Sequence, residues 1–365
     1  MKTLYLHIGT IKTGTKAIQC FCWENPGILQ KYGYIYPDLS SLCPQCTPVK
    51  NAHFLIEDIE NEDKNIRKKQ IQEKCQKGMD QIITLFSSYD NVILSDEGIY
   101  SATYLRRKTL WQELKEYGEN NGFTVKIIVY LRRQDELMIS AWNQHIKANS
   151  INPEQTFEEF ISAIPKSRQL NYFNKLESIA SILGKENIIV RRFVKEAFFG
   201  GSIYADFLHA VGLTLTDEYR ISKEKRNQSL LGNTHEIMRI LNGVSELGHK
   251  DLQFMRNILR IDGEISNTQY PSSMLSKKEF NKFMQRYKKT NHLVAEKYLQ
   301  QDGDLFEYTP PALPKWTADN PYMQQDIIRF AAIGMKKLRT DYKKLQADYK
   351  KLERKVNALS KAYNS

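Results

Sequence analysis

Residues 7–19 read His-Ile-Gly-Thr-Ile-Lys-Thr-Gly-Thr-Lys-Ala-Ile-Gln, and this stretch decides how the rest of the chain is interpreted. The apolar residues before Gly9 predict a buried strand over residues 3–8, and those after Gly14 recur at helical spacing over residues 15–30. Glycines let the backbone of such a loop curl so that its N–H groups point inward, and the following helix presents its positive end. The chain is therefore expected to begin with a strand, an anion-binding loop and a helix.

The alternation of short apolar strands and helices continues along the chain. Further strands are expected at 91–95, 125–131 and 187–191, and helices at 61–88, 104–120, 134–148 and 169–183, with helices predominating after residue 203. This pattern predicts an α/β fold with a P-loop-like parallel β-sheet flanked by helices. Ligands bind beyond the carboxyl ends of such strands, where Gly9–Gly14, Ser95–Gly98 and Arg132–Gln134 should converge.

The order of residues in the glycine loop differs from that of nucleotide kinases and GTPases. Those proteins place Lys and then Ser or Thr directly after the second glycine. Here Thr15 and Lys16 stand in the reverse order, and Lys12 lies inside the loop, before Gly14. A P-loop kinase, with Asp96 as its magnesium-holding acid, therefore remains only as an alternative.

The loop resembles the first signature of the sulfotransferases, above all the bacterial carbohydrate-type members, whose loop usually reads H-I-G-x-P/H-K-T-G-T-T-x-I-Q. This chain departs from that pattern at Ile11, where Pro or His is usual, and at Lys16, where Thr is usual. The first change affects only the stiffness of the loop. The second removes one hydroxyl from the phosphate cradle and adds a cation, but it leaves the backbone N–H in place.

A second segment, Val-Tyr-Leu-Arg-Arg-Gln-Asp-Glu-Leu-Met-Ile-Ser-Ala-Trp-Asn-Gln at 129–144, resembles the second sulfotransferase signature. The resemblance implies that Arg132, at the strand end, and Ser140, eight residues later, bind the 3'-phosphate of 3'-phosphoadenosine 5'-phosphosulfate (PAPS). It also implies that Arg226, in Lys-Arg-Asn-Gln-Ser-Leu (225–230), adds charge to that phosphate site. The resemblance covers roughly residues 3–310, and only the two signatures are specific.

Sulfuryl transfer from PAPS to a hydroxyl is the activity that this resemblance implies. Lys12 is expected to stabilise the bridging oxygen of the leaving nucleotide, because a fixed cation contributes most where charge develops. The cofactor's 5'-phosphate would be held by the N–H groups of Thr13, Gly14, Thr15 and Lys16. Glu97 is the first candidate for the general base and His53 the second. The scheme requires no metal.

The acceptor that the resemblance implies is a carbohydrate or glycolipid. Aromatic side chains that could stack on a sugar, or could equally belong to the core, are Tyr34, Tyr36, Tyr100, Tyr104 and Trp142. The sequence does not name the sugar or the position of its hydroxyl.

The composition and charge of the chain indicate which classes of partner to expect. The chain has 365 residues and a formal net charge of +11, which favours anionic ligands. No basic segment interleaves aromatic residues in a nucleic-acid motif, so nucleic acid is not expected as a partner. No apolar run approaches the roughly 18–20 residues of a membrane span, and the first residues do not resemble a signal peptide. The expected location is the cytoplasm, with the inner membrane surface as an alternative.

The five cysteines are Cys20, Cys22, Cys43, Cys46 and Cys75. An odd number in a cytoplasmic chain argues against a disulfide framework. Cys43 and Cys46 have the CxxC spacing of a zinc knuckle or of a redox pair, but no second pair at finger spacing completes a zinc site. They are therefore expected to be two unlinked loop cysteines.

The C-terminal region differs from the rest of the chain. Apolar residues alternate at spacings of four and three from Leu338 to Leu359, which is a short coiled-coil signal. We therefore expect a sulfotransferase-like α/β domain over residues 1–315 and a helical extension over residues 316–365. The extension could form a homo-oligomer, and a non-catalytic scaffold assembled through it is the third functional hypothesis.

Overall fold

Five parallel strands form a single sheet in the order β2-β3-β1-β4-β5. The strands are β1 (Lys2–His7), β2 (Tyr34–Ile35), β3 (Asn91–Ser95), β4 (Phe123–Leu131) and β5 (Ile188–Arg192). The chain first extends the sheet on one side of β1 and then, from β4 onward, on the other. The order in which strands are added therefore reverses at β1. In sheets of this kind, ligands bind beyond the carboxyl ends of the strands at the point of reversal, which here is the carboxyl end of β1.

This computed structural model describes residues 2–44, 46–57, 63–105, 109–148, 154–163, 170–222, 230, 232–265 and 272–363. Contacts group the chain into two compact units, which we describe separately. The first comprises Met1–Ala141, Ile164–Arg226 and Glu279–Pro310, and the second comprises Trp142–Ala163, Asn227–Lys278 and Pro311–Ser365. The division into residues 1–315 and 316–365 stays a prediction, because this grouping reflects contacts and not independent folding.

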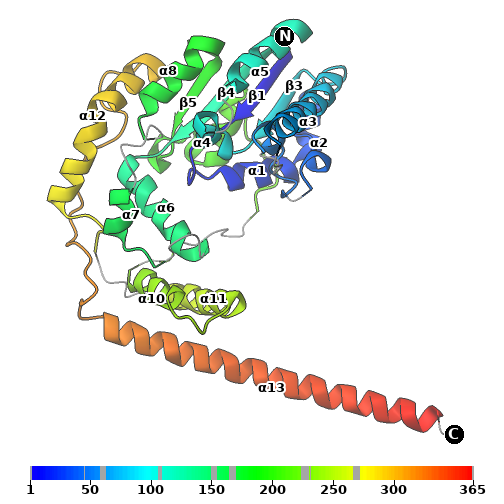
Figure 1. Cartoon of the computed structure of the whole chain (residues 1–365), viewed down its shortest axis with the longest axis vertical. Coiled ribbons are helices and arrows are strands. Elements are labelled where there is room, and N and C mark those ends of the chain that lie inside the picture. Colours follow the sequence, from blue (N-terminus) through cyan, green and yellow to red (C-terminus); the bar gives the residue numbers. More distant parts are fainter. Residues whose placement is uncertain are drawn as a thin grey trace. The chain divides into compact units, whose positions relative to one another are not determined.

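Helices flank the sheet of the first unit (Figure 1). They are α1 (Thr15–Glu24), α2 (Pro26–Lys31), α3 (Lys64–Leu85), α4 (Gly98–Leu105), α5 (Leu110–Asn121), the first half of α6 (Gln134–Ala148), α8 (Tyr172–Leu183), α9 (Ile203–Ala210) and α12 (Lys277–Leu299). The predicted α/β fold, a parallel sheet flanked by helices, is confirmed.

One face of the sheet shows how the core is built. Tyr5, Ile93, Ile128 and Tyr130 of the strands pack with Ile18 and Phe21 of α1 and with Phe207 and Leu208 of α9. Successive residues of a strand point to opposite faces, so the intervening side chains of β1, β3 and β4 face the other layer, where α5 contacts β4 and α8. Both faces are buried, which explains why the middle of β3 and residues 127–131 of β4 are continuously apolar.

The second unit is helical. It contains the second half of α6, α7 (Phe157–Ala163), α10 (Asn233–Asn242), α11 (His249–Ile265) and α13 (Met323–Tyr363). The first turns of α13 pack on α10 and α11, and Gly334 of α13 lies against the side chain of Ile258. Asn233 anchors this packing through hydrogen bonds with Asn320 and Asp326. Among the described helices, none combines the length and the apolar character that crossing a bilayer requires.

The helix predicted over residues 15–30 is wrong in one respect, because the structure divides it at Asn25. Helix α1 ends at Glu24 and α2 begins at Pro26. Proline has no N–H to donate and keeps the preceding residue out of the helical conformation, and Asn25 accordingly has φ −123°. Strand β2 was not predicted, since two residues are too short to show a period.

Asn25 holds this break together. Its side chain is buried, donates to the carbonyls of Phe21 (2.8 Å) and Arg220 (2.9 Å), and accepts from the N–H of Arg220 (2.7 Å). We expect Asn25→Ala to lower the free energy of unfolding by roughly 2–4 kcal/mol, because it leaves buried polar groups without partners. Urea denaturation monitored by circular dichroism measures this change.

Asn121→Ala is the matched control for that substitution. Asn121 also donates to a carbonyl four residues earlier, that of Tyr117, but it does so at the exposed end of α5. Its loss should cost less than about 0.5 kcal/mol. Equal effects of the two substitutions would show that Asn25 does not fix the break.

Candidate functional site

The loop between β1 and α1 has the backbone of an anion cradle. Gly9, Lys12 and Gly14 all have positive φ, at 42°, 64° and 74°. A Cβ on Gly14 would lie 2.5 Å from Cδ1 of Ile203, so a side chain there would have to displace Ile203 in addition to adopting a positive φ. Lys12 is one of few non-glycine residues with positive φ, a costly conformation that tends to persist at functional sites.

At the start of this loop the N–H of Thr10 donates to the carbonyl of Tyr130 at 3.1 Å, but the second half of the loop differs. Helix α1 takes up its first hydrogen bonds at Ala17 and Ile18, both of which donate to the carbonyl of Gly14. Within the described residues, no acceptor bonds the N–H groups of residues 13–16. The hydroxyl of Thr15 is likewise buried with no partner there. Donors without partners at a helix N-terminus are what a phosphate requires.

Arg132 lies at the same edge of the sheet as the loop. Its Nη1 donates to the carbonyl of Lys12 at 3.1 Å, and its guanidinium lies 5.5 Å from the centre of the Phe193 ring. Its own carbonyl accepts from the hydroxyl of Tyr172 at 2.6 Å. The Arg132 side chain also pairs with Glu136, at 3.3 Å. The end of β4 is thereby fixed beside the loop that follows β1.

Two cations therefore lie close together. The pKa of Lys12 is lowered by burial and by the positive charge of Arg132, and Glu97 opposes this by raising it. The lysine is thus electrostatically close to both residues. A bound anion would remove the repulsion between Lys12 and Arg132, so the charges favour an anionic ligand at this position.

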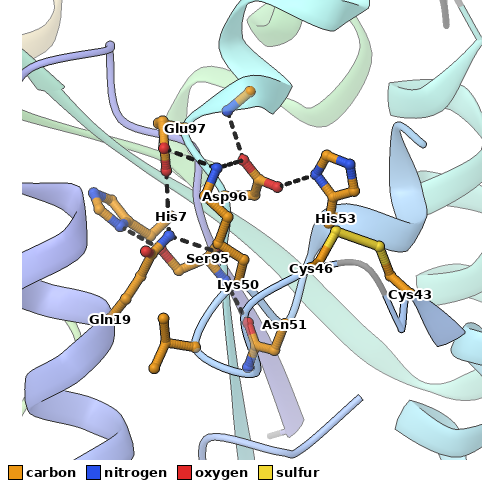
Figure 2. A network of polar contacts seen from close by, with 12 residues as sticks. His7, Gln19, Cys43, Cys46, Lys50, Asn51, His53, Ser95, Asp96 and Glu97 are labelled. Atoms are coloured by element: carbon orange, nitrogen blue, oxygen red, sulfur yellow. Dashed lines mark hydrogen bonds and ion pairs between the residues drawn. A yellow bond between two sulfur atoms is a disulfide. The ribbon is translucent and has the colours of Figure 1, made fainter. Parts of the chain in front are cut away.

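The end of β3 carries a network of polar side chains (Figure 2). Asp96 is fully buried, and its Oδ2 lies 2.7 Å from Nδ1 of His53. Its Oδ1 accepts from the N–H of Gly98 at 2.7 Å and lies 3.6 Å from Nζ of Lys50. Burial acts to raise the pKa of Asp96, but the hydrogen bond to His53 and the charge of Lys50 bring it below its ordinary value. Asp96 therefore remains ionised and orients His53.

Glu97 is held next to this network. Its Oε1 lies 2.9 Å from Nζ of Lys50, and its Oε2 accepts from Nε2 of Gln19 at 3.3 Å. Gln19 belongs to the helix that follows the glycine loop, so this contact connects the ends of β1 and β3. Burial acts to lower the pKa of Lys50, but Asp96 and Glu97 outweigh it, and the lysine remains a cation.

Two buried side chains, those of His7 and Asn51, form hydrogen bonds with Ser95 at the end of β3. Nδ1 of His7 lies 2.9 Å from Oγ of Ser95, and its Nε2 has no partner within the described residues. Asn51 accepts from the N–H of Ser95 at 2.8 Å and donates to the carbonyls of Pro37 and Ile93. The segment that carries Lys50, Asn51 and His53 is thereby attached to β3.

Cys43 and Cys46 are joined by a disulfide, so the expectation of two unlinked loop cysteines is wrong. The local turn brings them together, because the N–H of Cys46 donates to the carbonyl of Cys43. Their sulfur atoms and a ring nitrogen of His53 lie within 4.8 Å of one another, a group that could hold a metal ion once the thiols are reduced. The absence of a metal stays a prediction.

The structure brings most of the predicted residues to one edge of the sheet. Lys12, Thr13, Gly14, Thr15, Arg132 and Glu97 gather there, and His53 joins Glu97 through Asp96 and Lys50. Lys16 is exposed in the first turn of α1, and Ser140 is half-buried in the second turn of α6. Arg226 lies outside the described residues.

Sequence reasoning missed part of the site. Gln19, Lys50 and Asn51 were not singled out, and Asp96 was considered only as a kinase acid. Tyr34, Tyr36, Tyr100 and Trp142 are all buried and belong to the core, so they do not offer free faces to a sugar. The side chain of Tyr104 lies outside the described residues.

No protein-family model matches the chain. An uncharacterised protein of Archaeoglobus fulgidus is 26% identical over 179 residues, which are 47% of this chain and 45% of that protein. The chain therefore aligns with less than half of this relative's length.

Two solved structures are similar to the chain. A sulfotransferase from Alicyclobacillus acidocaldarius has 14% identity and a TM-score of 0.38, over 69% of this chain and 99% of that one. The sulfotransferase domain from the curacin biosynthetic pathway has 14% identity and a TM-score of 0.35, over 74% and 99%. At such scores these likenesses decide nothing about chemistry.

His7 predicts a pH dependence of stability. Burial lowers the pKa of His7 from 6.5 to about 3. Below pH 6.5 the unfolded chain binds a proton that the folded chain rejects, so stability falls as the pH falls from 6.5 toward 3 and is unaffected above 6.5. Between pH 7 and pH 5 the wild type should lose about 2 kcal/mol more than His7→Gln, measured by urea denaturation.

The control for this measurement is His249→Gln, since His249 is exposed at the start of α11. It should leave the difference between pH 7 and pH 5 unchanged. If His7→Gln loses as much stability as the wild type, His7 is not held neutral in the folded protein.

Proposed function

We propose that this chain is a sulfotransferase that uses PAPS as donor and a hydroxyl as acceptor. The observation that carries the proposal is the contact between Arg132 and the carbonyl of Lys12. It brings a guanidinium beside a glycine loop in which the N–H groups of residues 13–16 have no acceptor within the described residues. Two anion sites thus lie side by side at the carboxyl edge of the sheet. A nucleotide with phosphates at both its 5' and 3' positions is a ligand that needs two such sites.

The residues present fit this donor. The N–H groups of Thr13, Gly14, Thr15 and Lys16, together with the unpartnered hydroxyl of Thr15, would hold the 5'-phosphate. Arg132 would hold the 3'-phosphate, since a guanidinium can bind it through two parallel hydrogen bonds. Ser140 and Arg226 remain proposed additions to that second site. PAPS, once bound, supplies a sulfuryl group activated by a good leaving group.

Lys12 is proposed to stabilise the leaving nucleotide. The lysine is half-buried beside Arg132, and burial and this neighbour make a naked ammonium less favourable there. Negative charge that develops on the bridging oxygen would be paired at once, without reorganisation of water. Lys12 lies at the turn of the loop, where its backbone has a positive φ, so its charge belongs to the loop that would hold the donor.

Glu97 is proposed as the general base. Its charge raises the pKa of Lys12, which indicates that the carboxylate lies near the lysine, and a base must first be within reach of the reacting oxygen. Oε1 of Glu97 lies 2.9 Å from Nζ of Lys50. Because the transition state of such a transfer is loose, the acceptor proton leaves late, and an ionised carboxylate in position suffices. His53, oriented by Asp96, is the second candidate.

Other functions fit the geometry less well. Asp96 would have to hold magnesium in a kinase, but its carboxylate is already occupied by His53, Lys50 and the N–H of Gly98. We propose that transfer needs no metal, so it should persist in the presence of a chelator. A carbohydrate or glycolipid hydroxyl is proposed as acceptor on the sequence resemblance alone.

Thermal melting with nucleotides tests the proposed donor site. Adenosine 3',5'-bisphosphate should stabilise the protein by about 2.7 kcal/mol at a concentration of a hundred times its Kd. Adenosine 5'-monophosphate at the same concentration should stabilise it less, because only the sulfotransferase hypothesis demands a 3'-phosphate site. Greater stabilisation by ATP with magnesium would overturn the proposal in favour of a kinase.

Arg132→Ala and Arg133→Ala form a matched pair for the same measurement. Arg133 is adjacent but turned away, toward Asp135, Glu136 and the carbonyl of Glu307. Arg132→Ala should weaken bisphosphate binding roughly 10- to 100-fold, and the preference over the monophosphate should disappear. Arg133→Ala should retain that preference. The reverse result would remove Arg132 from the 3'-phosphate site.

The kcat of the Glu97→Gln and His53→Gln variants, measured with PAPS and a panel of sugar acceptors, tests which residue is the general base. Glu97→Gln should lower kcat by roughly 100- to 10,000-fold and leave bisphosphate binding within a factor of two or so, because this carboxylate does not contact the donor phosphates. His53→Gln should have a smaller effect. A larger loss in His53→Gln, with Glu97→Gln nearly active, would assign the base to His53.

A further inference from the structure

The helix α13 carries a long apolar stripe that its own unit does not cover. From Met335 to Ser360 every side chain of α13 is exposed. The stripe consists of Met335, Leu338, Tyr342, Leu345, Tyr349, Leu352, Val356 and Leu359, whose exposed fractions run from 55% to 71%. Only the earlier turns of α13 pack on α10 and α11.

A helix with an uncovered apolar face is expected to pack against another surface. Most of the stability of protein helices comes from tertiary packing of an apolar face. The residues of the stripe occur at alternating spacings of three and four over more than three heptads, which is the repeat of a coiled coil. In heptad terms Leu338, Leu345, Leu352 and Leu359 occupy d positions, and Met335, Tyr342, Tyr349 and Val356 occupy a positions.

We propose that residues 335–360 of α13 form an antiparallel two-stranded coiled coil with the same segment of a second copy of the chain. The first argument concerns the core layers. A parallel pair would place each tyrosine opposite itself, at Tyr342 and again at Tyr349. An antiparallel pair centred near Ala347 places every a residue opposite a d residue of the partner. The layers are then Met335 with Leu359, Leu338 with Val356, Tyr342 with Leu352, and Leu345 with Tyr349.

The second argument concerns the charges that flank the core. In antiparallel coiled coils, e positions face e positions and g positions face g positions. In this alignment Arg339 faces Glu353 of the second copy and Asp341 faces Lys355, and each pair forms twice because of the two-fold symmetry. The only like charges that meet are the two copies of Asp348, at the centre. In the single chain Asp341 already pairs with Lys337 at 3.1 Å, but both side chains are about half exposed and free to move.

In the alternative alignments, the charged side chains that face each other across the two helices repel each other or form fewer attractive pairs. In a parallel pair each Asp348 would face Glu353 of the second copy, a repulsion that forms twice, while Asp341 would face only Gln346. Shifting the antiparallel pair by one heptad in one direction places Asp341 opposite Asp348. Shifting it in the other direction retains only the attraction of Asp348 for Lys355. The charges therefore select both the orientation and the register.

Analytical ultracentrifugation of the full chain tests this proposal. The wild type should show a concentration-dependent equilibrium between monomer and dimer. Leu345→Asp should abolish the dimer, because it places a charge in the central layers. Leu345 is exposed in the single chain, so the fold of both units should be unaffected, as circular dichroism and the melting temperature will show.

Charge reversal distinguishes the two orientations. Glu353→Arg should weaken the dimer at least tenfold, because the introduced guanidinium then faces Arg339 of the other copy, and this repulsion forms twice. In a parallel dimer the same substitution would relieve the repulsion from Asp348 and strengthen association. Adding Arg339→Glu to Glu353→Arg should restore the wild-type dimer, since the pair is only exchanged.

Three outcomes would overturn the proposal. They are a chain that stays monomeric at high micromolar concentration, a dimer that tolerates Leu345→Asp, and a dimer that is tightened by Glu353→Arg. None of these measurements depends on sulfuryl transfer, so the dimer and the proposed enzymatic activity are tested independently.

Discussion

The hydrogen bond from Arg132 to the carbonyl of Lys12 is the interaction on which the candidate site depends. It joins the end of β4 to the loop after β1, and these two strands are neighbours in the sheet. The order of the strands makes this possible, since the chain returns to the far side of β1 only with β4. The contact also brings together two cations that repel each other. Glu136 pairs with Arg132 and Glu97 acts on Lys12, and a bound anion would offset the remaining repulsion between the two cations.

A second set of contacts connects the loop to the end of β3. Gln19 of α1 bonds Glu97, and Lys50 bridges Glu97 and Asp96. The proposed donor-binding groups and the candidate bases thus share one edge of the sheet, although they come from separate segments between Lys12 and Arg132. The disulfide between Cys43 and Cys46 introduces chemistry that the proposed reaction does not use. It lies next to His53, so the redox state of these cysteines decides whether His53 has two thiols or a disulfide as its neighbour.

Much of this arrangement could be predicted from the sequence. Glycine spacing and the apolar runs were sufficient for the sheet and for the loop, because both follow from local periodicity and from the conformational freedom of glycine at Gly14. Arg132 could be placed because parallel strands end at a common edge. The break at Asn25 was not foreseen, since the apolar period continues across it and only Pro26 announces it. The roles of Gln19, Lys50 and Asn51 depend on tertiary contacts that carry no local pattern. The same is true of the pairing of Asp96 with His53.

The central claim is that one nucleotide bridges the glycine loop and Arg132. A crystal structure of the chain soaked with adenosine 3',5'-bisphosphate tests it most directly. We predict the 5'-phosphate within hydrogen-bonding distance of the N–H groups of residues 13–16, and the 3'-phosphate within hydrogen-bonding distance of the guanidinium of Arg132. A nucleotide bound with its 3'-phosphate in solvent, or bound away from the glycine loop, would contradict the account.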